Sequence, residues 1–217
     1  STLNRDERRT TLKELFLDVE TTGAWLDGSP FSQTTKSGAY YHWDDLTEIA
    51  VCDADGNEVY RSFVCPKYRY FTCLSDWYPS EKPISSKNTD WTKAISGKSS
   101  VRVVEELRPI LQGARVIVHN LSFDEKVLRD SYAVRAGINH VSIHDLFPST
   151  DFVCSKKRAT RVMPKAESHY PSCGERCNGS RLTHLHHELG FGDYDEHDPL
   201  ADVQALAKVW SVLKTKS

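Results

Sequence analysis

The sequence predicts an α/β protein with a mixed β-sheet flanked by α-helices, and two observations support this fold class. Three segments of strand-like composition come first, and the turn "ADGN" at 54–57 separates the second from the third, as in an antiparallel hairpin. Strand-like and helix-like segments alternate through the rest of the chain. That alternation is typical of a layered α/β fold.

The expected elements can be justified in order. Apolar and β-branched runs predict the strands, and apolar residues at helical spacing predict the helices. Pro109 should disturb the last turn of its helix, Gly137 and Gly190 should end two helices, and Asp198 should cap the last one before Pro199. Strands are expected at 15–20, 46–53, 59–65, 115–118 and 140–146, and helices at 101–111, 122–136, around Asp151, at 182–189 and at 199–213.

Length and composition favour one domain. The 217 residues are 39% hydrophobic and 10% aromatic, so the chain can bury a sizeable core. We expect a flexible N-terminal arm over 1–14 and a single domain over 15–217. Three stretches, 24–44, 66–98 and 155–180, do not fit this element pattern, and we interpret them as long loops.

The charge balance and the cysteines limit the function classes. The net charge of -2 gives no global basic field, so a nucleic-acid partner would be held by a local patch or by bound cations. No apolar run has the length to cross a bilayer, so we expect no membrane association. The six scattered cysteines are interpreted as reduced thiols of an intracellular protein, cytoplasmic or nuclear.

The first strand, within "LFLDVETTG" at 15–23, carries two carboxylates. Side chains at i and i+2 share one face of a strand, so Asp18 and Glu20 point the same way. Two close carboxylates repel unless they are protonated or neutralised, and a divalent cation is the usual solution. The alternative is that the strand ends at Asp18 and "TTG" is an exposed turn.

Two distant segments carry further acids. In "HDPLADVQAL", at 197–206, Asp202 lies in the first turn of the expected last helix and His197 lies just before that helix. In "VIVHNLSFDEKVL", at 116–128, Asp124 lies in the first turn of a helix that follows a buried strand. Alone, an acid in a first turn often only compensates the helix dipole.

Together the three segments resemble the DEDD superfamily of 3′→5′ exonucleases, which includes the DnaQ-like proofreading subunits. The matching motifs are D-x-E-T-T-G at 18–23, H-N-x-x-F-D at 119–124 and H-x4-D at 197–202. A histidine at position 197 marks the histidine branch of this superfamily, DEDDh. The resemblance runs from about Leu15 to Leu213 and implies a ribonuclease H-like fold with a five-stranded mixed β-sheet flanked by α-helices.

The resemblance also implies a mechanism. Asp18, Glu20, Asp124 and Asp202 would hold two Mg²⁺ or Mn²⁺ ions, and His197 would be the general base. Two such cations activate water, orient the scissile phosphate and stabilise the leaving oxygen. The expected reaction is removal of nucleoside 5′-monophosphates from the 3′ ends of DNA or RNA, acting on a single-stranded end.

Candidate nucleic-acid contacts come from the motifs and from one basic run. Trp25 either stacks on the terminal base or covers a local hydrophobic cluster, and Phe123 either contacts the substrate or belongs to the core. The basic run at 156–165 either follows phosphates or is a solvated loop. The candidates are Thr21, Thr22, Trp25, His119, Asn120, Phe123, Lys156, Lys157, Arg158, Arg161 and Lys165.

Zinc is not favoured. Cys173 and Cys177 have an unusual C-x3-C spacing for zinc, and no clean second pair follows, although several histidines are near. Those histidines are His169, His184, His186 and His187.

Two other functions stay open. One is a nucleic-acid or polymerase-binding adaptor with little catalytic role, so a polymerase or another replication or repair protein is a candidate partner. The other is a sugar- or nucleotide-phosphate hydrolase on the same scaffold.

Overall fold

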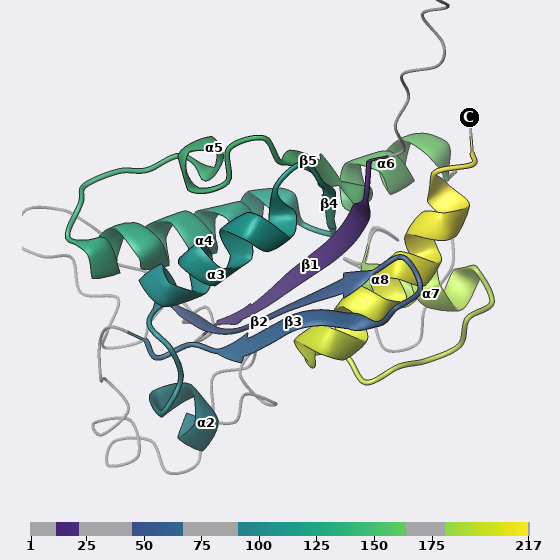
Figure 1. Ribbon diagram of the computed structural model, residues 1–217. Coiled ribbons are helices and arrows are strands. Elements are labelled where there is room, and N and C mark those ends of the chain that lie inside the picture. The colour runs from purple at the N-terminus through teal and green to yellow at the C-terminus, as the bar shows by residue number, and fades with distance from the viewer. Residues whose placement is uncertain (1–11, 22–44, 67–90, 164–180, 217) are drawn as a thin grey trace, which may run out of the picture.

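Figure 1 shows a computed structural model of the chain, which describes residues 12–21, 45–66, 91–163 and 181–216. Strands and helices alternate after an initial hairpin, as the sequence predicts. The strands are β1 (Glu14–Thr21), β2 (Leu46–Asp53), β3 (Glu58–Phe63), β4 (Arg115–Val118) and β5 (Asp151–Cys154). The helices are α2 (Trp91–Ile95), α3 (Ser100–Leu111), α4 (Leu121–Ala136), α5 (Ile143–Leu146), α6 (Ser155–Val162), α7 (Leu182–Glu188) and α8 (Pro199–Leu213).

The strands form one five-stranded mixed sheet in the order β3-β2-β1-β4-β5. β2 runs antiparallel to β1 and to β3, whereas β1, β4 and β5 are parallel. β1 therefore lies in the middle of the sheet. The expected fold class, a five-stranded mixed sheet flanked by helices, is confirmed.

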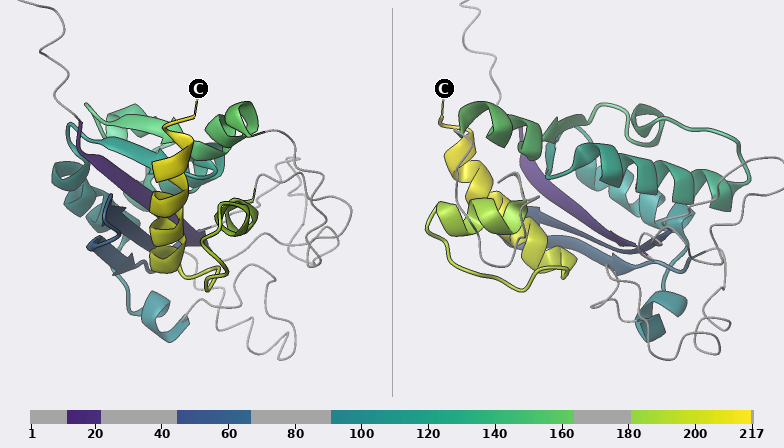
Figure 2. Two further views of the ribbon diagram at one scale, coloured as in Figure 1. Left: turned by 90° about the vertical axis from the view of Figure 1, so that its right-hand side faces the viewer. Right: turned by 180° about the vertical axis from the view of Figure 1, so that it is seen from behind.

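Helices cover both faces of the sheet, and each face has its own core (Figures 1 and 2). Leu15, Leu17 and Val19 of β1 pack in the cluster that includes buried residues of α3 and α4. Phe16 packs in the other cluster, which includes buried residues of α6, α7 and α8. Alternate residues of β1 thus point to opposite layers, as a pleated strand requires.

Two predicted elements are wrong. Segment 140–146 is not a strand but contains the short helix α5, because Ser142 and Asp145 form a capping box that starts a helical turn. The segment around Asp151 is not a helix but β5, whose four residues pair with β4.

The three expected long loops also differ from the structure where it describes them. Helix α6 occupies the start of 155–180, and α2 lies within 66–98. Segment 24–44 lies outside the described residues.

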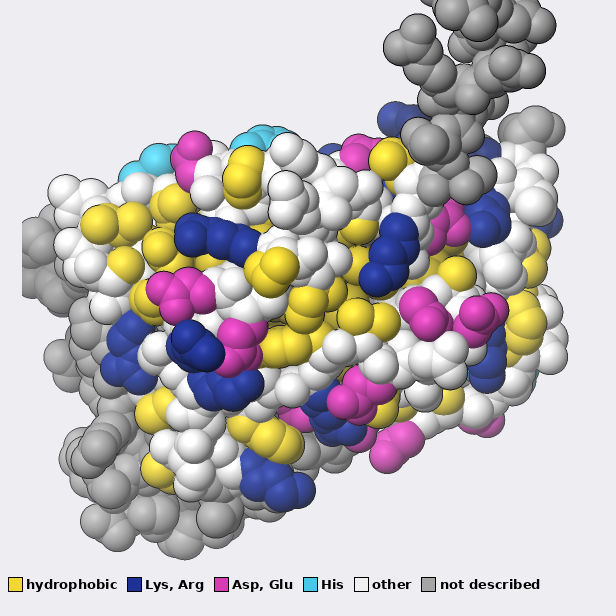
Figure 3. Space-filling view, in the orientation of Figure 1, with side chains coloured by type: hydrophobic (Ala, Val, Ile, Leu, Met, Phe, Trp, Pro, Cys, Tyr) yellow, Lys and Arg dark blue, Asp and Glu magenta, His cyan; other side chains and the backbone are white. Residues whose placement is uncertain are grey.

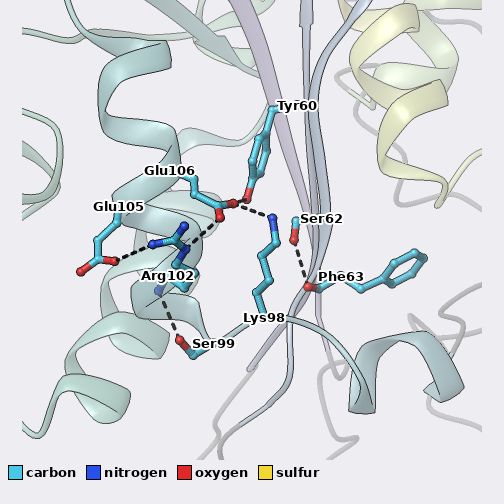
Figure 4. A network of polar contacts seen from close by, with 8 residues as sticks. All are labelled: Tyr60, Ser62, Phe63, Lys98, Ser99, Arg102, Glu105 and Glu106. Carbon is cyan, nitrogen blue, oxygen red and sulfur yellow. Dashed lines mark hydrogen bonds and ion pairs between the residues drawn. The ribbon is translucent and has the colours of Figure 1, made fainter.

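A polar network joins the edge strand β3 to α3 (Figure 4). The hydroxyl of Tyr60 donates to Glu106 Oε2 at 2.9 Å, and Lys98 Nζ lies 2.6 Å from the same oxygen. Arg102 Nε donates to Glu106 Oε1 at 2.9 Å. One carboxylate therefore collects three donors, and it ties the helix to the edge of the sheet.

The described surface fits the balanced charge of the sequence. On the face shown in Figure 3, Lys and Arg side chains are interspersed with Asp and Glu. Cys52, Cys65 and Cys154 are free thiols. Across the described ranges, no helix combines the length and the apolar character needed to cross a membrane.

Candidate metal centre

β1 presents two carboxylates to the layer that contains α8. Asp18 and Glu20 alternate with Leu17 and Val19, which are buried on the opposite face. The side chain of Glu20 is buried, and Asp18 is partly accessible. β1 continues to Thr21, so the strand does not end at Asp18, and that alternative is wrong.

Helix α8 brings the third carboxylate. Asp198 caps the helix by accepting hydrogen bonds from the N–H groups of Leu200 and Ala201, and Pro199 follows at the first helical position. Asp202 lies in the first turn, one residue before the buried Val203.

One ligand oxygen from each of Asp18, Glu20 and Asp202 lies within 4.8 Å of the other two. We call these three residues the carboxylate triad. Two distant parts of the chain, strand β1 and helix α8, therefore converge on one point.

Helix α4 adds Asp124 beside the triad. β4 pairs with β1 only as far as Leu17 opposite Val118, so the end of β1 extends past β4. α4 begins at Leu121, directly after this point, and its first turn contains Asp124, which is 3% exposed. The charge of Asp124 acts on Asp18, so the four carboxylates form one electrostatic group.

Burial and mutual repulsion make ionisation of these four groups unfavourable. Burial, together with Asp124, Asp202 and Glu20, raises the pKa of Asp18 well above its usual range. Burial, with Asp202 and other acids, raises the pKa of Glu20 to about 8, and burial raises the pKa of Asp124 to about 7. The pKa of Asp202 is also raised by burial. A group of this kind binds protons or cations.

The donor set fits a hard divalent cation. All the ligand atoms are carboxylate oxygens, which is the chemistry that Mg²⁺ and Mn²⁺ prefer. A cation bound to the triad would neutralise the repulsion that raises these pKa values. We assign Asp18, Glu20 and Asp202 as the residues that would hold it, with Asp124 adjacent.

Both oxygens of Asp202 accept hydrogen bonds within the protein. The hydroxyl of Tyr194 donates to Oδ1 at 2.8 Å, and the backbone N–H of His197 donates to Oδ2 at 3.0 Å. The ring of Tyr194 packs edge-on against His186, at 5.0 Å between centroids, and His186 Nδ1 donates to the carbonyl of Gly192 at 2.8 Å. Sequence reasoning missed Tyr194, because its role depends on this packing.

His197 lies beside the triad in an unusual backbone conformation. Its φ of 70° is in the left-handed region, which residues other than glycine rarely adopt. The imidazole is exposed, and its charge acts to lower the pKa of Asp202. The predicted general base is therefore close to the predicted metal ligand.

A fifth carboxylate and an arginine flank the triad, and sequence reasoning missed both. Glu48 of β2 lies directly opposite Glu20 of β1. Arg61 of β3 binds Glu48 at 2.7 Å and Asp198 at 3.3 Å. The signal for Glu48 was present, since it interrupts the apolar run of a buried strand as Asp18 does.

The predicted nucleic-acid contacts are described in part. Thr21 ends β1 and is buried, while Thr22 and Trp25 lie outside the described residues. Phe123 is 36% exposed and belongs to neither hydrophobic core, so a core role for it is wrong.

His119 and Asn120 join β4 to α4. His119 Nδ1 lies 3.0 Å from Ser155 Oγ, and Asn120 is exposed at the N-cap of α4. Their contact with nucleic acid stays a prediction.

The basic run forms helix α6 rather than a loop. Lys157 and Arg161 are exposed, and Lys156 is half-buried. Arg158 donates to the carbonyl oxygens of Leu213 and Lys216 at the far end of α8. That end is about 16 Å from Asp202 at 1.5 Å per residue. Lys165 lies outside the described residues.

The histidines near the two candidate zinc cysteines are described in part. His184 and His186 are buried in α7, and His187 Nδ1 lies 3.2 Å from Asp193 Oδ1. Cys173, Cys177 and His169 lie outside the described residues. In the part of the chain that the structure describes, the carboxylate triad is the group of candidate ligands that converges.

The comparisons with known proteins agree with this fold. The chain matches no protein-family model, and no curated protein matches it by sequence. It has the ribonuclease H-like α/β fold, and its similar solved structures include exonuclease I from E. coli.

Three structures of exonuclease I illustrate the likeness. The complex with a dT13 oligonucleotide has a TM-score of 0.59 at 16% identity, and covers 94% of this chain and 41% of that one. The complex with a dA16 oligonucleotide has a TM-score of 0.57 at 17% identity, and the match covers 95% of this chain and 41% of that one. The zinc-bound complex with single-stranded DNA has a TM-score of 0.56 at 18% identity, and the match covers 94% of this chain and 40% of that one. The chain thus spans less than half the length of exonuclease I.

Proposed function

We propose that this protein is a metal-dependent 3′→5′ exonuclease of the DEDDh type. The observation that carries the proposal is the convergence of Asp18, Glu20 and Asp202 within 4.8 Å on a ribonuclease H-like fold. Asp124 and His197 adjoin the triad, so the five residues predicted to act in catalysis lie near one another.

The residues have distinct roles in this proposal. Asp18, Glu20, Asp124 and Asp202 would hold two Mg²⁺ or Mn²⁺ ions, which would supply Lewis-acid activation of water and stabilisation of the leaving 3′-oxygen. His197 accepts the proton of that water from an exposed position beside Asp202. Tyr194 and the N–H of His197 orient the carboxylate of Asp202.

The proposed substrate is the 3′ end of a single-stranded polynucleotide. Exonuclease I, whose structures resemble this chain, is seen in complex with dT13 and dA16 oligonucleotides. The exposed ring of Phe123, one residue before Asp124, can stack on a base, and stacking tolerates any sequence. Phe123 would then position the end of the strand beside the carboxylates.

The direct test is a cleavage ladder. Single-stranded and duplex DNA and RNA, labelled at the 5′ end, are incubated with Mg²⁺ or Mn²⁺. We expect stepwise shortening from the 3′ end and nucleoside 5′-monophosphates as products. Asp18→Asn should remove this activity, because it removes a ligand charge from the triad. If no substrate is shortened by the unmodified protein, an adaptor role replaces this proposal.

A further inference from the structure

We propose that Arg61 is a positioning residue that holds the turn containing His197 against the carboxylates of β1. The inference rests on the exonuclease function proposed above and extends it to a strand at the edge of the sheet. Arg61 forms its ion pairs with Glu48 and Asp198 rather than with the triad, so it would act through Asp198 and His197.

The guanidinium of Arg61 joins the sheet to the start of α8. Its Nε lies 2.7 Å from Glu48 Oε1 on the neighbouring strand, and a terminal nitrogen lies 3.3 Å from Asp198 Oδ2. The side chain of Glu48 is 5% exposed, so this end of the bridge is anchored in the protein interior. Arginine suits the position because its planar fork serves two carboxylates at fixed angles.

The two oxygens of Asp198 have separate partners. Oδ1 accepts the N–H groups of Leu200 and Ala201 at the start of α8, whereas Oδ2 binds Arg61. Because both oxygens are engaged, the carboxylate cannot rotate freely. Asp198 directly follows His197, so fixing this carboxylate also fixes the end of the turn.

The turn at His197 needs such support. A left-handed conformation is unfavourable for a residue other than glycine, and His197 adopts it with φ of 70°. The conformation directs the N–H of His197 to Asp202 Oδ2 at 3.0 Å. Arg61 therefore supports a turn that sets both the imidazole and the metal-binding carboxylate.

Arg61 also offsets the charge of Glu48, and the two effects can be separated. Glu48 lies opposite Glu20, so without a cation partner it would add negative charge beside the triad. Arg61→Gln removes both the bridge and this compensation. Glu48→Gln with Arg61→Gln removes the uncompensated charge but leaves the bridge broken, so the double variant should stay impaired.

The first test is kinetic. We expect Arg61→Gln to lower kcat about tenfold or more, with little change in KM, because the misplaced group acts in the chemical step. Arg61→Lys should be intermediate, since an ammonium is a compact charge without the planar fork. In a His197→Ala background, Arg61→Gln should have a smaller effect, because the part of its effect that passes through the imidazole is already lost.

Asp198→Asn is the matched probe on the other side of the bridge. Asparagine caps helices as well as aspartate does but lacks the charge that binds Arg61. We expect a loss of kcat with a nearly unchanged melting temperature. Arg115→Gln is the control, because Arg115 forms an ion pair with Asp151 at 2.8 Å between β4 and β5 and should not affect turnover.

The second test needs no activity. Hydrogen exchange of the segment 196–202 should be about tenfold faster in Arg61→Gln than in the unmodified protein, and unchanged in Arg115→Gln. The positioning role would be overturned if Arg61→Gln left the exchange rate or kcat unchanged. It would also be overturned if Arg61→Gln lowered kcat equally with and without His197, or if the double variant with Glu48→Gln recovered full activity. If the unmodified protein cleaves nothing, the exonuclease proposal fails, and exchange still decides whether Arg61 holds the turn.

Discussion

His197 and Asp202 show how single residues of the site depend on one another. The N–H of His197 and the hydroxyl of Tyr194 hold the two oxygens of Asp202, so the orientation of this carboxylate is set by the protein. Preorganised ligands bind a cation with less loss of side-chain freedom. The backbone that carries the imidazole and the proposed metal ligand Asp202 are thus positioned together.

The first residue-scale prediction concerns the general base. His197→Ala should lower kcat about 10²–10⁴-fold, the usual contribution of general base catalysis. Addition of Mn²⁺ should still raise the melting temperature, because the carboxylates remain. His187→Ala is the control, since His187 is exposed and lies beside Asp193 rather than the triad. Near-normal turnover of His197→Ala would contradict the mechanism.

The second residue-scale prediction concerns Tyr194. Tyr194→Phe keeps the ring that packs on His186 but removes the hydrogen bond to Asp202 Oδ1. We expect the half-maximal Mn²⁺ concentration to rise about 10-fold or more, because a hydrogen bond to a charged group contributes about 1.5–3 kcal/mol. Tyr60→Phe removes an equivalent bond to Glu106 on α3 and should leave the Mn²⁺ dependence unchanged. An unchanged dependence in Tyr194→Phe would rule out the orienting role.

The site was predicted from the sequence only where its residues lie in motifs. Asp18 and Glu20 were placed on one face by the two-residue period of a strand, and Asp202 by the capping pattern of its helix. Arg61 was missed because its partners are 13 and 137 residues away. Tyr194 was missed because its position depends on how its ring packs against His186. No local pattern reports such contacts.

At the scale of elements, long periodic segments were predicted well, and so was the short apolar strand β4, but two other short elements were not. α8 begins and ends as expected, because a cap, a proline and a regular apolar stripe all indicate it. β5 and α5 have four residues each, which is too few to show a period. In α5, the capping box of Ser142 and Asp145 determines that the segment is helical. The capping box was the signal that was overlooked.

The element-scale prediction separates two roles within α6. Arg158 donates to carbonyl oxygens at the end of α8, so Arg158→Gln should lower the free energy of unfolding by about 0.5–1.5 kcal/mol with little effect on binding. Lys157→Gln with Arg161→Gln should instead leave stability unchanged. If α6 binds the phosphates of the substrate, the double variant should lose about two phosphate contacts. The slope of the logarithm of the binding constant against the logarithm of salt concentration should then become less steep by about two contacts.

Thermal unfolding and salt-dependent binding assays of the unmodified protein, Arg158→Gln and the double variant check this prediction. An unaltered salt slope in the double variant would mean that α6 only supports α8.

At the scale of the whole molecule, the buried acids link stability to pH and to metal. Burial and neighbouring acids raise the pKa of Glu20 to about 8 and that of Asp124 to about 7 in the metal-free protein. In the unfolded chain both groups ionise near pH 4. Between these values the folded state holds more protons than the unfolded state, so stability falls as pH rises.

We therefore expect the melting temperature of the metal-free protein to decrease from about pH 5 to pH 8. Mn²⁺ should raise it far more at pH 8 than at pH 5, because cations compete with protons for the same carboxylates. Glu20→Gln should weaken both effects. Calorimetry in chelator and in excess Mn²⁺ tests this. A flat pH profile in chelator would show that these carboxylates are not strained by one another.

The extension of β1 past β4 has a consequence for folding. α4 and α8 contribute the other carboxylates at this end of β1, so the centre forms only when residues about 180 positions apart meet. Glu14 also binds Trp210 and Lys214 across a similar separation. Contacts of such large sequence separation are slow to form. A nascent or partly unfolded chain therefore keeps Asp202 apart from Asp18 and Glu20, so the proposed metal centre would be completed only late in folding.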